Sequence, residues 1–137
     1  MKNFLRKDVL RKIPAIAVMA GIFALSALPG EDPLLNAFHF NDKIKHVIAY
    51  FVLGISFCLW ASPKNWFVRP LFWGILVVVL GTCFGILDEY HQSFVPGRSG
   101  NDFGDMVADF IGTLAAPFVY FFGIKVVSVT LLREPKE

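Results

Sequence analysis

The chain has 137 residues, of which 55% are hydrophobic and 18% are charged, and its formal net charge is +2. Soluble domains usually carry about 25% charged residues, so this composition argues against an ordinary soluble protein. The few basic residues flank apolar segments, which argues against nucleic acid as a partner. The length suits one domain, and we therefore predict a single transmembrane domain over residues 1–137.

Apolar runs long enough to cross a bilayer recur along the chain. A transmembrane helix needs about 20 mostly apolar residues, and turn-forming segments such as "EDPLLNAFHFND", "SPKNW" and "SFVPGRSGND" separate the runs. The first run follows a basic start and could instead be a signal peptide, but no small-residue cleavage pattern ends it cleanly. We expect an all-α fold, a transmembrane four-helix bundle, with spans at residues 12–30, 43–62, 69–89 and 105–125.

The distribution of basic residues predicts the orientation of these spans. Most of them fall on one side of a four-span chain: Lys2, Arg6, Lys7, Arg11, Lys12, Lys64, Arg69, Lys125, Arg133 and Lys136. The other side holds only Lys43, Lys45 and Arg98. Because loops rich in Lys and Arg stay in the cytoplasm, we expect cytoplasmic N- and C-termini and external loops at residues 31–46 and 88–105.

Ionisable residues gather where the last three spans approach the outer surface. Helix rise places His46 and Glu89 near the outer boundary of the hydrocarbon and Asp109 about one turn inside it. Asp42, His46 and Tyr50 recur every four residues and share one helix face, as do Asp105 and Asp109. Ionisable groups at this depth normally face a bundle interior or a wet cavity. The sequence therefore predicts a polar pocket that opens outward.

Two further features bear on how this pocket closes. Gly81, Gly85 and Glu89 recur at the same spacing, and a small-x-x-x-small pattern lets a second helix approach closely, which would turn Glu89 inward. The loop around "VPGRSG" can cover the pocket. We expect Arg98 on this loop to fold back over Glu89 and Asp109 and to offset their charge.

Known catalytic motifs are absent from the sequence: it contains no H-E-x-x-H zinc helix, no glycine-rich phosphate loop and no G-x-S-x-G nucleophile elbow. Carboxylate oxygens suit hard cations, so a divalent metal is chemically conceivable among Glu89, Asp105, Asp109 and His46. Our prediction is nevertheless a site without a metal and without a cofactor.

Four segments resemble the VanZ-like family of small bacterial integral membrane proteins. They are "SALPG", "DKIKHVIAYFVLG", "DEYHQSFVPGR" and "DMVADFIG", and the resemblance covers roughly residues 20–120. It implies a multi-pass protein of the bacterial cytoplasmic (inner) membrane. The family's name-giving member is associated with resistance to the glycopeptide antibiotic teicoplanin. In the family the position of Asp109 is often Asn or Asp. The resemblance implies a fold but no established reaction.

The predicted pocket binds the polar, anionic or amide-bearing group of a membrane lipid, a lipid-linked envelope component or a glycopeptide antibiotic. Arg98 and Lys43 are the expected charge partners, although Lys43 and Lys45 have an alternative role as head-group anchors. His46 and Gln92 are the expected neutral hydrogen-bonding groups. The predicted ligand-binding residues are Asp42, Lys43, His46, Tyr50, Asp88, Glu89, Gln92, Arg98, Asp105 and Asp109.

Two alternatives remain open at this stage. The protein could be a membrane-embedded hydrolase or transferase acting on a lipid-linked envelope substrate. The catalytic candidates would then be Glu89, His46 and Asp109, with Glu89 or His46 as general base, because burial can tune such a group. It could also be a structural subunit whose polar residues only pair with one another. The sequence leaves the ligand's identity and the oligomeric state open.

Overall fold

The computed structural model of the protein describes residues 2–37 and 41–133, which form six helices. These are α1 (Lys2–Ser26), α2 (Pro33–Asn36), α3 (Asp42–Cys58), α4 (Pro63–Val68), α5 (Pro70–Gln92) and α6 (Phe103–Arg133). No strand occurs within the described residues, so the all-α prediction is confirmed.

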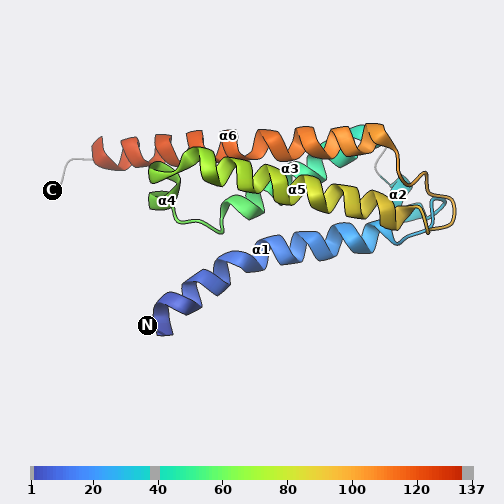
Figure 1. Ribbon diagram of the computed structural model, residues 1–137, viewed down its shortest axis with the longest axis horizontal. Coiled ribbons are helices and arrows are strands. Elements are labelled where there is room, and N and C mark those ends of the chain that lie inside the picture. The colour runs from blue at the N-terminus through green and yellow to red at the C-terminus, as the bar shows by residue number, and fades with distance from the viewer. Residues whose placement is uncertain (1, 38–40, 134–137) are drawn as a thin grey trace.

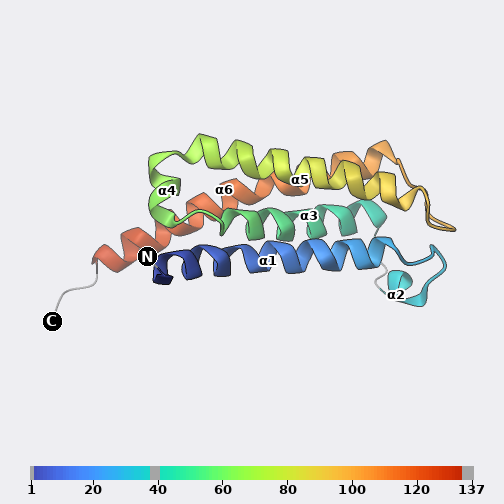
Figure 2. The ribbon, with the colours of Figure 1, turned by 60° about the horizontal axis from the view of Figure 1, so that its bottom comes forward.

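The four longer helices lie side by side along the long axis of the molecule (Figures 1 and 2). The amino end of α1, the short helix α4 and the carboxyl end of α6 all lie at one end of the bundle. Helix α2 and the loop between α5 and α6 lie at the other end, which we call the α2 end. The residues of the predicted pocket are therefore brought to a single end of the molecule.

Three of the long helices contain segments long and apolar enough to cross a membrane: Asp8–Ser26, Pro70–Gln92 and Phe103–Thr130. Helix α3 has 17 residues, or about 25 Å at 1.5 Å per residue, which is shorter than the roughly 30 Å hydrocarbon core. The predicted span extends to about residue 62, whereas α3 itself ends at Cys58 and Ser62 caps α4 by accepting a hydrogen bond from the Asn65 N–H at 3.3 Å. Helix α6 extends beyond both predicted limits.

Small residues allow α6 to approach α3 and α5 closely. A Cβ added to Gly85 would lie 2.8 Å from Asp109 Oδ2, and one added to Gly54 would lie 2.6 Å from the Cβ of Ala116. Gly81 and Gly112 are similarly restricted, by Thr113 and by the backbone of α3. The prediction that Gly81 and Gly85 form a helix-packing face is confirmed. This face also holds the ionisable residues of α5 and α6 together.

Replacing Gly81 with Leu tests this close packing. A Cβ at Gly81 would lie 2.7 Å from Thr113 Oγ1, whereas a Cβ at Gly123 on α6 meets nothing within 4 Å. Overpacking a tight contact costs about 1–3 kcal/mol, so Gly81→Leu should lower the thermal unfolding midpoint in detergent. The matched control Gly123→Leu should not. Equal midpoints for the two variants would show that α5 and α6 are not packed through this face.

Candidate functional site

The loop between α5 and α6 is held against the turn that follows α1. The Gly30 N–H donates a hydrogen bond to the Pro96 carbonyl at 3.1 Å, and a side chain at Gly30 would collide with the backbone of Gly97. Gly97 has φ +73°, a conformation that glycine adopts without steric cost. The Asn101 N–H donates to the Glu89 carbonyl at 3.2 Å. Two segments that are far apart in the sequence, "SALPG" and "VPGRS", thus form one side of the site.

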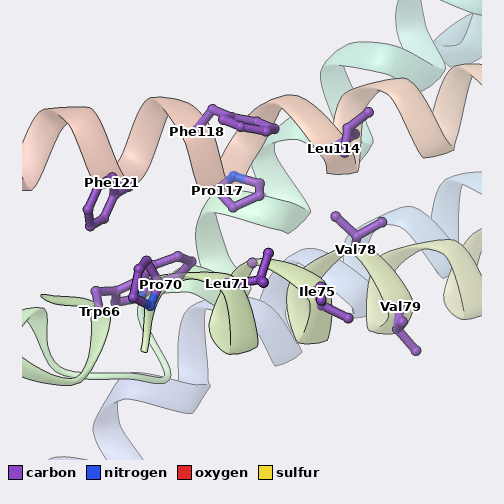
Figure 3. A pocket seen from close by; sticks show the side chains of 11 residues that line it. Trp66, Pro70, Leu71, Ile75, Val78, Val79, Leu114, Pro117, Phe118 and Phe121 are labelled. Carbon is purple, nitrogen blue, oxygen red and sulfur yellow. The ribbon is translucent and has the colours of Figure 1, made fainter. Parts of the chain in front are cut away.

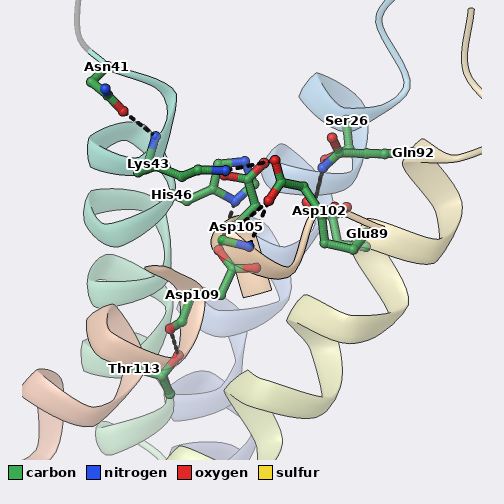
Figure 4. A network of polar contacts seen from close by, with 12 residues as sticks. Ser26, Asn41, Lys43, His46, Glu89, Gln92, Asp102, Asp105, Asp109 and Thr113 are labelled. Atoms are coloured by element: carbon green, nitrogen blue, oxygen red, sulfur yellow. Dashed lines mark hydrogen bonds and ion pairs between the residues drawn. The ribbon is translucent and has the colours of Figure 1, made fainter. Parts of the chain in front are cut away.

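An ion-pair cluster joins the first turns of α3 and α6 (Figure 4). Lys43 Nζ lies 2.7 Å from Asp105 Oδ1 and 2.9 Å from Asp102 Oδ2. Asp102 also caps α6, because its Oδ1 accepts a hydrogen bond from the Gly104 N–H at 2.6 Å. The Lys43 ammonium, followed by that N–H, holds the pKa of Asp102 below its usual range. We call Lys43, Asp102 and Asp105 the Lys43 cluster.

His46 and Asp109 form a buried pair below the Lys43 cluster (Figure 4). His46 Nδ1 lies 2.8 Å from Asp109 Oδ1, and the two residues are 9% and 1% exposed. The rings of His46 and Tyr50 are stacked, with centroids 6.4 Å apart, so the two residues share one face of α3, as their spacing predicted. When Asp109 is ionised, it accepts a hydrogen bond from the Nδ1–H of a neutral His46, and the Nε2 lone pair of that imidazole is then available to another group.

Glu89 is the most enclosed acid of α5, at 1% exposure. Its Oε2 accepts a hydrogen bond from the Asp102 N–H at 3.0 Å, and its Oε1 has no partner among the described residues. We expected Arg98 to fold over Glu89 and Asp109, but the structure differs. Arg98 donates to Gln92 Oε1 from both Nε and Nη2, and no ion pair between Arg98 and either acid is found in the described part of the chain.

Asp88 lies at the centre of a second chain of contacts, which we call the Asp88 network. Its Oδ2 accepts hydrogen bonds from Ser26 Oγ at 2.8 Å and from Gln92 Nε2 at 3.0 Å. Gln92 in turn accepts from Arg98, so one amide side chain connects the buried carboxylate to the guanidinium. The Asp88 side chain is 4% exposed, and its Oδ1 is without a partner within the described residues.

A cavity of about 120 Å³ opens between α1, α3 and α5 beside the Asp88 network. Six of the ten predicted ligand-binding residues line it, together with Ser26, Lys45 and four apolar side chains. The polar lining residues are Ser26, Asp42, Lys45, His46, Tyr50, Asp88, Gln92 and Arg98. The other four predicted residues, Lys43, Glu89, Asp105 and Asp109, belong instead to the Lys43 cluster and the buried contacts behind His46.

Sequence reasoning did not identify Ser26 and Lys45 as site residues. Ser26 is the last residue of α1 and is 4% exposed, and it enters the site only because α1 ends beside Asp88. A single serine at the end of an apolar helix is too common to indicate this. Lys45 was considered only as a head-group anchor, but it lines the cavity and donates to the Leu35 carbonyl at 3.1 Å.

One group of side chains has the composition of a cation site. Ligand atoms of Asp42, His46 and Asp105 all lie within 4.8 Å of one another, and divalent cations accept carboxylate and imidazole ligands. This set differs from the set considered from sequence, because Asp42 replaces Glu89 and Asp109. The Lys43 ammonium already contacts Asp105 at 2.7 Å and would compete with a metal ion for that carboxylate.

A larger groove of about 490 Å³ lies between α5 and α6 near α4, away from the polar site (Figure 3). Trp66, Pro70, Pro117, Phe118 and Phe121 are among its lining residues, and all the side chains that line it are apolar or weakly polar. It has no group for acid–base or ionic chemistry. The candidate functional site is therefore the cavity at the α2 end, with the contacts that hold it.

Together these features define a helical, multi-pass membrane protein with a buried polar site at one end of the bundle. Residues 7–125 match the family model for VanZ/LLP1 proteins. Because the match covers most of the chain, the chain belongs to the VanZ/LLP1 family, and the resemblance seen in the sequence is confirmed. No curated protein and no solved structure matches the chain.

The Lys43 cluster can be tested by removing its cation. Lys43→Met leaves Asp105, which is 3% exposed, without its ion-pair partner. An unsatisfied buried group costs about 1–3 kcal/mol, so thermal unfolding in detergent should occur at a lower temperature, and Asp105→Asn should restore part of the loss.

Lys45→Met is the matched control for this prediction. The ion pair between Lys45 and Asp42 spans 3.8 Å and is partly exposed, and such pairs contribute within about 1 kcal/mol. If Lys45→Met destabilised the protein as much as Lys43→Met, the Lys43 cluster would have no special role in joining α3 to α6.

Proposed function

We propose that this protein spans the cytoplasmic membrane of a bacterium four times and binds the head group of a membrane lipid or lipid-linked envelope component in the cavity at the α2 end. Helix α3 is the fourth span. It lies alongside α6 through close contacts at Gly54 and Gly112, and in sequence it separates α1 from α5. A short span is accommodated by local thinning of the bilayer or by its neighbours.

The charge distribution over the two ends of the bundle supports cytoplasmic termini. Lys64 lies within α4 and Arg69 directly follows it, at the end where α1 begins and α6 ends. The first half of α1 adds five basic residues at this end: Lys2, Arg6, Lys7, Arg11 and Lys12. The α2 end carries the acidic residues of the site and fewer basic residues, namely Lys43, Lys45 and Arg98. Since the excess of Lys and Arg marks the cytoplasmic side, the cavity opens toward the outer leaflet.

This topology predicts which loops are accessible from outside the cell. In a variant with Cys58→Ala and Cys83→Ala, a cysteine placed at Ser99 should react with a membrane-impermeant thiol reagent in intact cells. A cysteine placed at Lys64 should react only after the membrane is permeabilised. The reverse pattern would invert the orientation and place the cavity on the cytoplasmic side.

The observation that carries the proposed binding function is that two residues lining the cavity have buried polar atoms without a partner. Asp88 Oδ1 and Tyr50 Oη are buried and have no partner among the described residues. Each such group costs about 1–3 kcal/mol when it is left unsatisfied. A purely structural cluster would be expected to pair these groups, whereas a ligand-binding cavity keeps them available for its ligand.

The cavity can be tested by filling it. Ala49 lines the cavity, and its neighbour Ile48 is 51% exposed on the outside of the bundle. Wild-type protein purified in mild detergent should retain a characteristic lipid species, identified by mass spectrometry. Ala49→Phe should lose that species, and Ile48→Phe should keep it. Identical lipid profiles for all three proteins would contradict binding in the cavity.

We also propose a role in glycopeptide resistance, which the resemblance to the family's name-giving member suggests. The cavity volume of about 120 Å³ suits a small head group and not a whole glycopeptide. We therefore expect any effect on teicoplanin to act through the bound envelope component. Expression in a sensitive bacterium should raise the inhibitory concentration of teicoplanin, and Ala49→Phe should abolish the increase.

An enzymatic role is the second candidate, and the His46–Asp109 pair supports it. The 2.8 Å contact fixes the imidazole ring, and His46 also lines the cavity. A carboxylate that orients a histidine is the arrangement used in general-base catalysis. As a hydrolase or transferase, the protein should convert the retained lipid, and His46→Gln should preserve retention while stopping conversion. Retention without any product in the wild type would leave binding as the function.

A further inference from the structure

The cavity has two chemically different regions, and the difference identifies a class of ligand. Its interior carries the 4%-exposed Asp88, whereas the cationic groups of Lys45 and Arg98 come from less buried residues. We propose that the cavity recognises a zwitterionic head group in which a phosphate and a primary amine are joined by a short linker. The amine would contact Asp88 and Tyr50, and the phosphate would contact Arg98 and Lys45. This inference rests on the proposed head-group binding.

The interior of the cavity is suited to an ammonium group. The partners of Asp88 Oδ2 are the neutral side chains of Ser26 and Gln92, and no ion pair involving Asp88 is found in the described part of the chain. Asp88 Oδ1 and Tyr50 Oη are buried atoms of two lining residues, and neither has a partner among the described residues. A primary ammonium has three N–H donors and a positive charge. It offers donors for such acceptors and compensates the charge of the buried carboxylate, whereas a neutral hydroxyl would leave that charge uncompensated.

The outer part of the cavity is suited to a phosphate group. Arg98 uses Nε and Nη2 on Gln92, and a guanidinium has further N–H donors in a plane that matches phosphate oxygens. Lys45 contributes a second cation. Its ion pair with Asp42 is long, at 3.8 Å, and the Asp42 side chain is 57% exposed. With two cations and one carboxylate, this region keeps a net positive charge.

Gln92 sets the separation between the two regions. Its Nε2 donates to Asp88 Oδ2 at 3.0 Å, and its Oε1 accepts from Arg98 Nε at 3.1 Å. The carboxylate and the guanidinium are therefore separated by a single amide group. This short separation suits an amine and a phosphate joined by a two-carbon linker, and apolar side chains such as Ile22 and Leu25 can cover the methylene groups.

The size of the cavity excludes larger head groups from its interior. A volume of about 120 Å³ corresponds to roughly four water molecules at about 30 Å³ each. An aminoethyl group with part of its phosphate fits such a space, but a sugar or peptide does not. The chemistry named here occurs both in a phosphoethanolamine lipid and in its water-soluble head group, so the experiment must separate these two sources.

The test measures ligand preference by calorimetric titration of the full chain in detergent. The probes are short-chain phosphatidylethanolamine, phosphatidylglycerol and phosphatidylcholine, together with glycerophosphoethanolamine. Wild-type protein should bind the ethanolamine lipid at least about tenfold more tightly than either other lipid, because only it offers a charged N–H donor. Binding of glycerophosphoethanolamine with similar affinity would indicate a soluble ligand, whereas a strong preference for the acylated form would indicate a membrane lipid.

Substitutions then assign the preference to the two regions. Asp88→Asn should lower the affinity for the ethanolamine lipid about tenfold and bring it close to that for phosphatidylglycerol. Tyr50→Phe should also reduce the preference for the ethanolamine lipid. Because the hydroxyl that it removes has no partner among the described residues, this variant tests the ammonium contact even if Asp88→Asn fails to fold. Arg98→Gln should lower the affinity for all three phospholipids to a similar extent, because each of them carries the phosphate. Glu31→Gln, an exposed acid that does not line the cavity, is the matched control.

Three outcomes separate this inference from the proposed function. An ethanolamine preference that depends on Asp88 or Tyr50 supports the zwitterionic ligand. The inference is overturned if all three lipids bind equally and if Asp88→Asn and Tyr50→Phe leave the ratios of their affinities unchanged. If Ala49→Phe blocks this binding, head-group binding in the cavity still stands. Lipid binding that Ala49→Phe does not affect overturns both.

Discussion

The structure depends on enclosing carboxylates within apolar helices. Asp88, Glu89, Asp105 and Asp109 are each at most 4% exposed, and an unpaired charge in such surroundings is costly. Each receives a different compensation: neutral donors for Asp88, a backbone N–H for Glu89, the Lys43 ammonium for Asp105 and the His46 imidazole for Asp109. These contacts come from α1, α3, the end of α5 and the loop before α6, so the acids can be enclosed only when all parts of the α2 end are assembled.

The glycines that allow close helix packing therefore lie beside the residues that form the polar site. Gly85 lets α5 approach Asp109 and Tyr50, and Gly112 lets α6 approach the backbone of α3. The other end of the bundle, around α4, holds an aromatic core and an apolar groove and needs no such compensation. Polar chemistry is concentrated where the helices are tied by hydrogen bonds and ion pairs, which is the arrangement expected when a membrane protein binds a polar group.

Helical periodicity predicted much of this architecture. The stripe of Asp42, His46 and Tyr50 and the glycine face of α5 were identified from spacing alone, because a helix repeats every 3.6 residues. Pairing could not be predicted in the same way. Arg98 contacts Gln92 and not Glu89 or Asp109, because its loop follows a path set by the left-handed Gly97 and the Gly30–Pro96 hydrogen bond. Such contacts join distant segments, and no local pattern specifies them. Ser26 was missed for the same reason.

In the proposed complex, a phosphate-bearing lipid head group occupies the cavity beside Arg98. Solid-state NMR on protein labelled with ¹⁵N at arginine, in bacterial membranes, measures this contact directly. A guanidinium nitrogen that donates to a phosphate oxygen lies about 4 Å from the phosphorus. We expect such a ³¹P–¹⁵N contact for Arg98 in the wild type, and we expect Ala49→Phe to lose it. If the Arg98 signal shows no phosphorus contact, or shows the same contact when the cavity is filled, the head group does not bind there.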